Sequence, residues 1–107
     1  MNITYADFQK LDLRVAEILE ASVHPNADKL LLLKVRVGDH EKKIVAGIKL
    51  FYPPETLIGK KVIVVDNLEP AVIRGETSEG MLLAASDDSG LTLVTPERPI
   101  ASGAKVK

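Results

Sequence analysis

Cysteine is absent from this chain, and its absence excludes disulfide bonds, thiolate nucleophiles and thiolate-bound metals. Tryptophan is absent too, and aromatic residues make up only 4% of the sequence. A platform of several exposed rings, on which single-stranded RNA could stack, is therefore not expected. No apolar run approaches the ~18 residues that a membrane span needs, and the polar N-terminus does not resemble a secretion signal. We expect a cytoplasmic protein.

A strong net charge is also missing. The chain carries 14 basic and 15 acidic side chains, for a formal net charge of −1. The whole molecule is therefore not steered toward a polyanion, and any contact with nucleic acid must come from a local patch of cations. The chain does contain enough apolar residues for one core, since 46% of its 107 residues are apolar. We assign residues 1–107 to a single domain with its core at about residues 7–86.

Short apolar segments separated by turn residues predict the secondary structure. Thr4 and Asp7 resemble a helix-capping pair, and Pro53 and Pro54 precede a brief helix that ends at Gly59. Strands are predicted over residues 11–23, 29–37, 42–52, 60–66, 81–86 and 104–107, with a turn at 87–90 leading into 91–96. Residues 67–80 are expected to be a long irregular connection. For residues 11–23 a helical stripe fits as well as strand alternation, so the pattern leaves this segment open.

The order of these elements predicts an all-β fold. Five core strands with a small helix before the fourth match the five-stranded oligonucleotide/oligosaccharide-binding (OB) barrel. The predicted barrel carries short N-terminal and inter-strand helices and a C-terminal strand extension.

Sites for catalysis or metal binding are not predicted. His24, Asp28 and His40 could meet around a metal, but we interpret them as solvated turn residues. Ser78 has no G-x-S-x-G setting and no histidine near it in sequence. The glycines around it form neither a Walker motif nor a dinucleotide fingerprint. We expect no catalytic residue, no metal and no cofactor.

The stretch RGETSEGM, residues 74–81, is the segment that could hold side chains out for a ligand. A guanidinium fork, and a hydroxyl flanked by glycines, can approach phosphate closely, which makes Arg74 and Ser78 candidates. The alternative is an ordinary strand connection in which Arg74 pairs with Glu76 or Glu79. The residues of this stretch alone favour that alternative.

Several blocks, taken in order, resemble the structure-specific tRNA-binding domain family. They are DFQKLDLRVAEI, HPNADKLLLLKVRVG, KKIVAGI, NLEP with IRG, and SEGMLLAAS, and they span residues 7–86. This fold is appended to methionyl-tRNA synthetases, to the bacterial phenylalanyl β subunit and to eukaryotic synthetase cofactors. The resemblance implies an OB barrel that binds the outer corner of tRNA by recognising its shape. It also implies that residues 11–23 form a strand.

The resemblance also implies the contact residues. Lys29 and Arg74 would meet phosphates, Ser78 a phosphate or a 2′-hydroxyl, and Met81 would fill an apolar floor. Two further residues would lie behind them, namely Asn67 and Lys49. Because this chain is less basic than many members, Glu76 and Glu79 are expected either to orient Arg74 or to limit binding.

For assembly, the resemblance implies a homodimer, since members this short present one RNA surface from two copies. Residues 87–107 are expected in the dimer interface. The leading hypothesis is a non-catalytic tRNA-binding module, either the C-terminal domain or the β subunit of a methionyl-tRNA synthetase, with the catalytic part in cis or in trans. A competing hypothesis is an export-type chaperone of the same fold that binds unfolded polypeptide, although the HPNADKL turn favours RNA. An enzyme with an unrecognised site is the third hypothesis.

Overall fold

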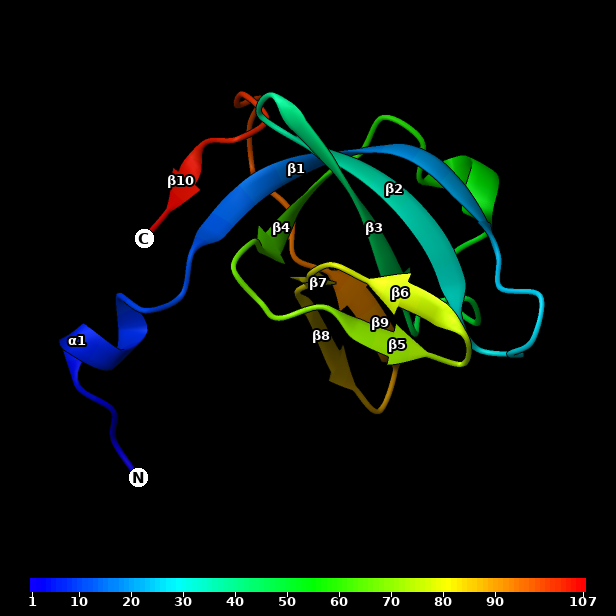
Figure 1. Cartoon of the computed structure of the whole chain (residues 1–107), viewed down its shortest axis with the longest axis horizontal. Helices are drawn as coiled ribbons and strands as arrows, with labels where there is room; N and C mark the ends of the chain where they lie inside the picture. Colours follow the sequence, from blue (N-terminus) through cyan, green and yellow to red (C-terminus); the bar gives the residue numbers. More distant parts are fainter.

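The main body of the protein is a curled antiparallel sheet (Figure 1). The computed structural model describes residues 1–107, and the sheet order is β3-β2-β1-β4-β7, with β10 also paired to β1. The strands are β1 Leu13–Val23, β2 Leu31–Val37, β3 His40–Ala46, β4 Lys61–Val65, β7 Met81–Leu82 and β10 Lys105–Val106. Two short helices, α1 (Tyr5–Phe8) and η1 (Pro54–Thr56), precede β1 and β4. The predicted all-β, OB-like architecture is confirmed.

Strand β1 is shared by both halves of the barrel. Its first half pairs with β4 and β10, and its second half pairs with β2. The register with β2 shifts between Ile18 and Glu20, and such an irregularity bends a strand and increases its twist. This segment is a strand, as the resemblance predicted and as periodicity alone could not decide.

The barrel closes between β3 and the segment before β7 through side-chain hydrogen bonds. Ser78 Oγ accepts the backbone N–H of Val45 at 3.0 Å and donates to the carbonyl of Gly80 at 2.9 Å. The backbone N–H of Glu79 donates to the carbonyl of Lys43 at 2.7 Å, and a Glu79 carboxylate oxygen accepts the Lys43 N–H at 2.9 Å. These bonds satisfy backbone groups on the edge of β3, which an open sheet would leave unpaired.

Two hairpins extend beyond the sheet; the first was not predicted, and of the second only the turn at residues 87–90 was predicted correctly. Residues 67–80, expected to be irregular, contain β5 (Ala71–Ile73) and β6 (Glu76–Ser78), which pair with each other. The predicted strand over residues 81–86 is divided into β7 and β8 (Ala84–Asp87), and β8 pairs with β9 (Gly90–Leu93). Both errors arise because strands of two to four residues carry too little alternation to be recognised.

The third strand is shorter than predicted. It ends at Ala46 rather than at residue 52, because the chain turns at Ile48. The backbone N–H groups of Phe51 and Tyr52 donate to the Ile48 carbonyl at 3.0 and 3.1 Å. Residues 48–52 therefore form a turn, exposed at Leu50 and Phe51, rather than the end of a strand.

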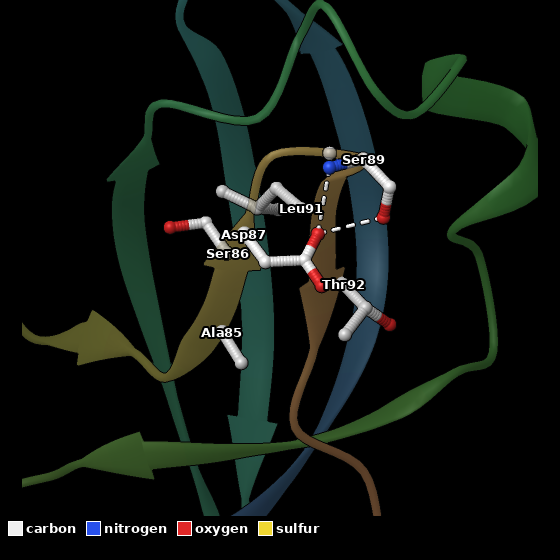
Figure 2. A pocket seen from close by; sticks show the side chains of 7 residues that line it. Ala85, Ser86, Asp87, Ser89, Leu91 and Thr92 are labelled. Atoms are coloured by element: carbon white, nitrogen blue, oxygen red, sulfur yellow. Dashed lines mark hydrogen bonds between the residues drawn. The ribbon is translucent and has the colours of Figure 1, made fainter.

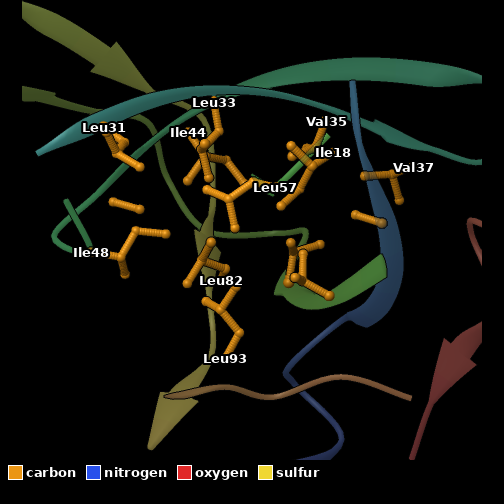
Figure 3. Close-up of a cluster of buried hydrophobic side chains, with 14 residues drawn as sticks. Ile18, Leu31, Leu33, Val35, Val37, Ile44, Ile48, Leu57, Leu82 and Leu93 are labelled. Atoms are coloured by element: carbon orange, nitrogen blue, oxygen red, sulfur yellow. The ribbon is translucent and has the colours of Figure 1, made fainter. Parts of the chain in front are cut away.

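The core fills the inside of the barrel (Figure 3). Residues of β2 face it in alternation, with Leu31, Leu33, Val35 and Val37 buried between half-buried or exposed neighbours. Leu57, which directly follows η1, is fully buried in the same cluster. Two buried residues are polar, His24 and Ser78. None of the helices has the length and apolar character that crossing a bilayer requires.

The C-terminal segment folds back onto the start of β1. The N–H of Gly103 donates to the carbonyl of Val15 at 2.7 Å, and Lys105 pairs with Arg14 in the β1–β10 ladder. A β-carbon on Gly103 would lie 2.8 Å from the Cα of Gly38, so only glycine fits this approach. Both termini therefore lie near the start of β1, away from the turn that joins β1 to β2 (Figure 1).

Candidate functional site

Arg74 lies at the tip of the β5–β6 hairpin in an unfavourable backbone conformation. Ile73 and Glu76 pair across the hairpin, so Arg74 and Gly75 form its two-residue turn. Both have positive φ, 54° and 90°, as a type I′ turn requires. For a residue with a β-carbon, the left-handed region costs about 1–2 kcal/mol. An arginine retained in this conformation leads to the hypothesis that its side chain has a function.

The imidazole of His24 joins this hairpin to the β1–β2 turn. Its Nδ1 accepts the backbone N–H of Asn26 at 3.0 Å, and its Nε2 lies 3.3 Å from the carbonyl oxygen of Ile73. The side chain is buried, with 2% exposure. The interpretation of His24 as a solvated turn residue is therefore wrong, because both ring nitrogens are used inside the protein.

Arg74 and Lys29 border one shallow hollow. The guanidinium of Arg74 donates to the carbonyl of Asn26 at 3.0 Å, which holds it over the β1–β2 turn. The hollow, of about 310 Å³, is lined by Ala27, Asp28, Lys29, Leu30 and Arg74, and we call it the Lys29–Arg74 hollow. The backbone N–H of Lys49 donates to the carbonyl of Lys29 at 3.3 Å. Three predicted contact residues from three separate segments are thus brought together.

The two cations that line this hollow, and Lys49 beside them, have no carboxylate partner. Lys29, Lys49 and Arg74 take part in none of the ion pairs of the molecule. Asp28 contributes a carboxylate to the rim, but it pairs with none of them. Lys29 and Arg74 are exposed and Lys49 is half-buried. Their charges are therefore available to an anion.

Cations on the β2–β3 face are neutralised instead. Lys34 lies 3.2 Å from Glu41 and 3.4 Å from Glu20, and the hydrogen bonds to Glu41 and then Glu20 raise the pKa of its ammonium group. Arg36 pairs with Glu17 in the same way. Although this face carries several basic residues, its charge is balanced, and it offers less to a polyanion than the Lys29–Arg74 hollow does.

Ser78 does not serve as a surface contact. It is 3% exposed, and its hydroxyl is engaged by Val45 and Gly80 at the closure of the barrel. The predicted contact with a phosphate or a 2′-hydroxyl is wrong for this geometry. Burial of this serine follows from the pairing of β5 with β6, which places alternate residues of β6 toward the interior.

The two glutamates of the loop do not bind Arg74. Glu79 bonds the backbone of Lys43, and the Glu76 carboxylate lies 3.8 Å from the Lys43 ammonium group. They therefore neither orient Arg74 nor neutralise it. The sequence alternative in which Arg74 pairs with one of them is wrong.

The two remaining predicted residues lie elsewhere. Asn67 Oδ1 accepts the N–H of Asp12 at 2.9 Å, and its Nδ2 donates to the carbonyl of Lys10 at 2.7 Å. Its side chain thus anchors the segment before β1, and its predicted place behind the contact remains a prediction. Met81 is half-buried and pairs with Val65 in the β4–β7 ladder. Its predicted role as an apolar floor remains a prediction.

Two other hollows on the surface differ in charge. One lies over the β8–β9 hairpin (Figure 2), where Asp87 accepts hydrogen bonds from the hydroxyl and the backbone N–H of Ser89 at 2.6 and 2.8 Å. These two bonds lower the pKa of Asp87, so the hollow holds a carboxylate. A second hollow contains Lys60, Lys61 and Arg98 together with Glu97, and none of these four side chains takes part in an ion pair. No group of three or more His, Asp or Glu side chains gathers where it could hold a metal ion.

Known proteins share both the sequence and the fold. The family model described as putative tRNA binding domain matches residues 13–105. The methionine–tRNA ligase of Nanoarchaeum equitans is 50% identical over 105 residues, which is 98% of this chain and 14% of that protein. The chain therefore spans about one seventh of the length of such relatives.

Two solved structures are similar over nearly their whole length. A MetRS related protein from Pyrococcus horikoshii has a TM-score of 0.93 and 34% identity, with 100% of this chain and 99% of that chain covered. A CsaA chaperone protein from Picrophilus torridus has a TM-score of 0.92 and 38% identity, with 99% and 100% covered. The resemblance identified in the sequence is confirmed, and the chain belongs to the putative tRNA-binding domain family.

Proposed function

We propose that this chain binds tRNA by shape through Lys29, Lys49 and Arg74. The observation that carries the proposal is the gathering of these three unpaired cations on one side of a barrel whose family is the tRNA-binding domain. Arginine can meet a phosphate with two parallel hydrogen bonds, while each lysine acts as a point charge. Such contacts fix position on the RNA backbone without reading the sequence.

The charge pattern supports a moderate affinity. Two unpaired cations, Lys29 and Arg74, line the hollow, and Lys49 lies beside Lys29, while the chain as a whole has a formal net charge of −1. Weak binding of tRNA is still useful when the domain is tethered to a second tRNA-binding protein, because a linked module acts at a high effective concentration. We therefore propose that the chain works as an accessory module of a methionine–tRNA ligase, in cis or in trans, and that it contributes binding rather than catalysis.

We also propose that the chain forms a homodimer through its N-terminal helix and C-terminal strand. Tyr5, Leu11 and Ile3 are exposed at 69%, 42% and 65%, although side chains of this kind are usually buried. Tyr5, Phe8, Leu11 and Val106 line a common hollow. A second copy would cover this apolar surface and add a second set of cations. Sedimentation at micromolar concentration measures the mass of the particle in solution. A mass of 11.6 kDa, that of a single chain, would contradict the proposal.

A salt titration tests the tRNA contact. Each phosphate that a cation neutralises contributes about −0.7 to −0.9 to the slope of log K against log salt. We expect the affinity for bulk tRNA to fall steeply with salt, and the slope to become shallower by about that amount per subunit in Lys29→Ala. Lys34→Ala is the matched control, because the charge of Lys34 is already balanced. An affinity that does not respond to salt would contradict the proposed contact.

The second candidate function is binding of unfolded polypeptide. The similarity to a CsaA chaperone protein over the full chain favours it. Competition separates the two functions: bulk tRNA and a reduced, unfolded polypeptide are offered to the same protein. We expect tRNA to displace the polypeptide; the reverse result would favour the chaperone function.

A further inference from the structure

The turn after β3 holds an aromatic ring in solvent. Residues 48–52 turn on the carbonyl of Ile48, and Leu50 and Phe51 at its tip are 66% and 47% exposed. The neighbouring Tyr52 is used differently, because its hydroxyl accepts the N–H of Leu93 at 3.1 Å. That bond has the larger effect in lowering the pKa of the Tyr52 hydroxyl, and a hydrogen bond with Thr92 lowers it further. Tyr52 is committed to the fold, whereas the ring of Phe51 is not.

The ring of Phe51 is supported from the β8–β9 hairpin. A β-carbon placed on Gly90 would lie 3.7 Å from Cε1 and 3.8 Å from Cδ1 of the ring, so the hairpin turn packs at one edge of it. Gly90 has a φ of 140°, a conformation that side chains with a β-carbon rarely adopt. The position therefore excludes a larger residue that would cover the ring. Phe51 is held in place on one side and remains open to solvent.

The exposed ring is close in the chain to one of the unpaired cations. Lys49 is bonded to Lys29 through the backbone, and Phe51 follows Lys49 by two residues, which limits their Cα separation to ~7 Å. An exposed ring next to unpaired lysines is the combination that RNA-binding surfaces use, with cations on phosphates and a base stacked on the ring.

We propose that Phe51 stacks on a base exposed by an RNA loop, while Lys49 and Lys29 hold the flanking phosphates. The inference rests on the proposed function and adds to it a contact with a base. Stacking depends on the face of the base and not on its hydrogen-bonding edge. The contact therefore tolerates different tRNAs and agrees with recognition by shape.

The absence of tryptophan makes this contact directly measurable. Phe51→Trp would carry the single tryptophan of each subunit, and stacking of a base on the indole is expected to quench its fluorescence when tRNA is added. The matched control is Leu68→Trp, because Leu68 has the same 47% exposure. Leu68 lies between Asn67 and Glu69 on the acidic β4–β5 connection. Its tryptophan is expected to keep its intensity in the complex.

Phe51→Leu supplies the affinity test. Leucine keeps an apolar side chain but has no flat face, so we expect tRNA affinity to fall about tenfold with an unchanged melting temperature. The salt slope should stay that of wild type, because no charge is removed, while Lys49→Ala should make it shallower. This pair of readouts separates a lost base contact from a lost phosphate contact.

The outcomes distinguish this inference from the proposed function. If wild type binds tRNA, and Phe51→Leu binds equally well with no quenching in Phe51→Trp, the stacking inference is wrong and tRNA binding stands. If wild type does not bind tRNA, both are wrong. Quenching by unfolded polypeptide but not by tRNA would overturn the inference as well and would assign the ring to a peptide.

Discussion

The Nε2 atom of His24 lies 3.3 Å from the carbonyl oxygen of Ile73, a residue 49 positions further along the chain. Nδ1 of the same ring accepts the N–H of Asn26, so the N–H of Nε2 is the donor to the carbonyl of Ile73. The bond joins the last residue of β5 to the β1–β2 turn. Arg74 follows Ile73 directly, and Lys29 lies in that turn, so His24 fixes the relative positions of the two cations.

Removing the imidazole should therefore weaken tRNA binding through Arg74. His24→Ala leaves the N–H of Asn26 and the carbonyl of Ile73 without their partner, and we expect a loss of about 1–3 kcal/mol in the free energy of unfolding. Affinity for tRNA should fall too. In an Arg74→Asn background the same change should cost little further affinity, because His24 would act on affinity by positioning Arg74, and residues that share a partner couple.

Ile18→Val is the control for stability alone. Ile18 is fully buried in the core, and this truncation costs about 0.5–1.5 kcal/mol without touching the hollow. We expect its tRNA affinity to equal that of wild type. If the effects of His24→Ala and Arg74→Asn on affinity simply add, His24 does not act through Arg74.

Arg74→Asn should separate stability from binding. Asparagine tolerates the left-handed conformation better than arginine does, so the melting temperature should stay the same or rise. Affinity for tRNA should fall by at least about tenfold, the usual effect of losing a charged hydrogen bond. Thermal unfolding and tRNA titration of one preparation check both parts; a variant that unfolds more easily yet binds normally would contradict the assignment.

Ser78→Ala should open the barrel rather than remove an RNA contact. The change leaves the buried N–H of Val45 without its acceptor, which costs about 1–3 kcal/mol. Thr77→Ala, at the exposed neighbouring position, should change stability far less. Chemical denaturation compares the two. Amide exchange at Val45 should quicken in Ser78→Ala, while tRNA affinity measured well below the melting temperature should change little.

The pH dependence of stability should report on Asp12. Partial burial would raise the pKa of this carboxyl group, but hydrogen bonds from Arg14 and then Lys105 outweigh burial and lower the pKa below its ordinary value of 3.8. The stabilisation is therefore present above that value and is lost as the pH falls through the folded pKa. Asp12→Asn should be less stable than wild type by about 0.2–1 kcal/mol near pH 6.

The same comparison at low pH completes the test. Once the carboxyl group of wild type is protonated, the two proteins should converge in stability, because both then carry a neutral side chain at residue 12. Asp88→Asn, at an exposed turn position, is the control and should follow the wild-type curve. A difference between Asp12→Asn and wild type that persists unchanged into acid would show that the ion pairs are not its cause.

Most of the barrel could be predicted from the sequence, because its strands alternate and its turns contain Gly, Pro or Asp. The predicted strand at residues 60–66 corresponds closely to β4, and the N-terminal helix is capped by Thr4 as expected. The β5–β6 hairpin could not be predicted. Its strands have three residues each, and its Arg-Gly turn replaces the Asn-Gly that marks type I′ turns in sequence.

The candidate site was predicted in part, and its errors share one cause. Lys29 and Arg74 were identified through the resemblance, and the structure brings them to one hollow. Ser78 and His24 were misplaced because burial of a polar side chain depends on partners that are distant in sequence. Those partners, Val45 and Ile73, lie 33 and 49 residues away, and no local pattern reports them.

The position of the two termini has a consequence for anything joined to this chain. Both lie near the start of β1, whereas the Lys29–Arg74 hollow lies beyond its other end, so the length of β1, roughly 30 Å, separates them. A partner fused at either terminus would leave the cations uncovered. The barrel would then hold its point of attachment and its RNA-binding surface a fixed distance apart. The length of the linker would set how far from the partner the RNA can be bound.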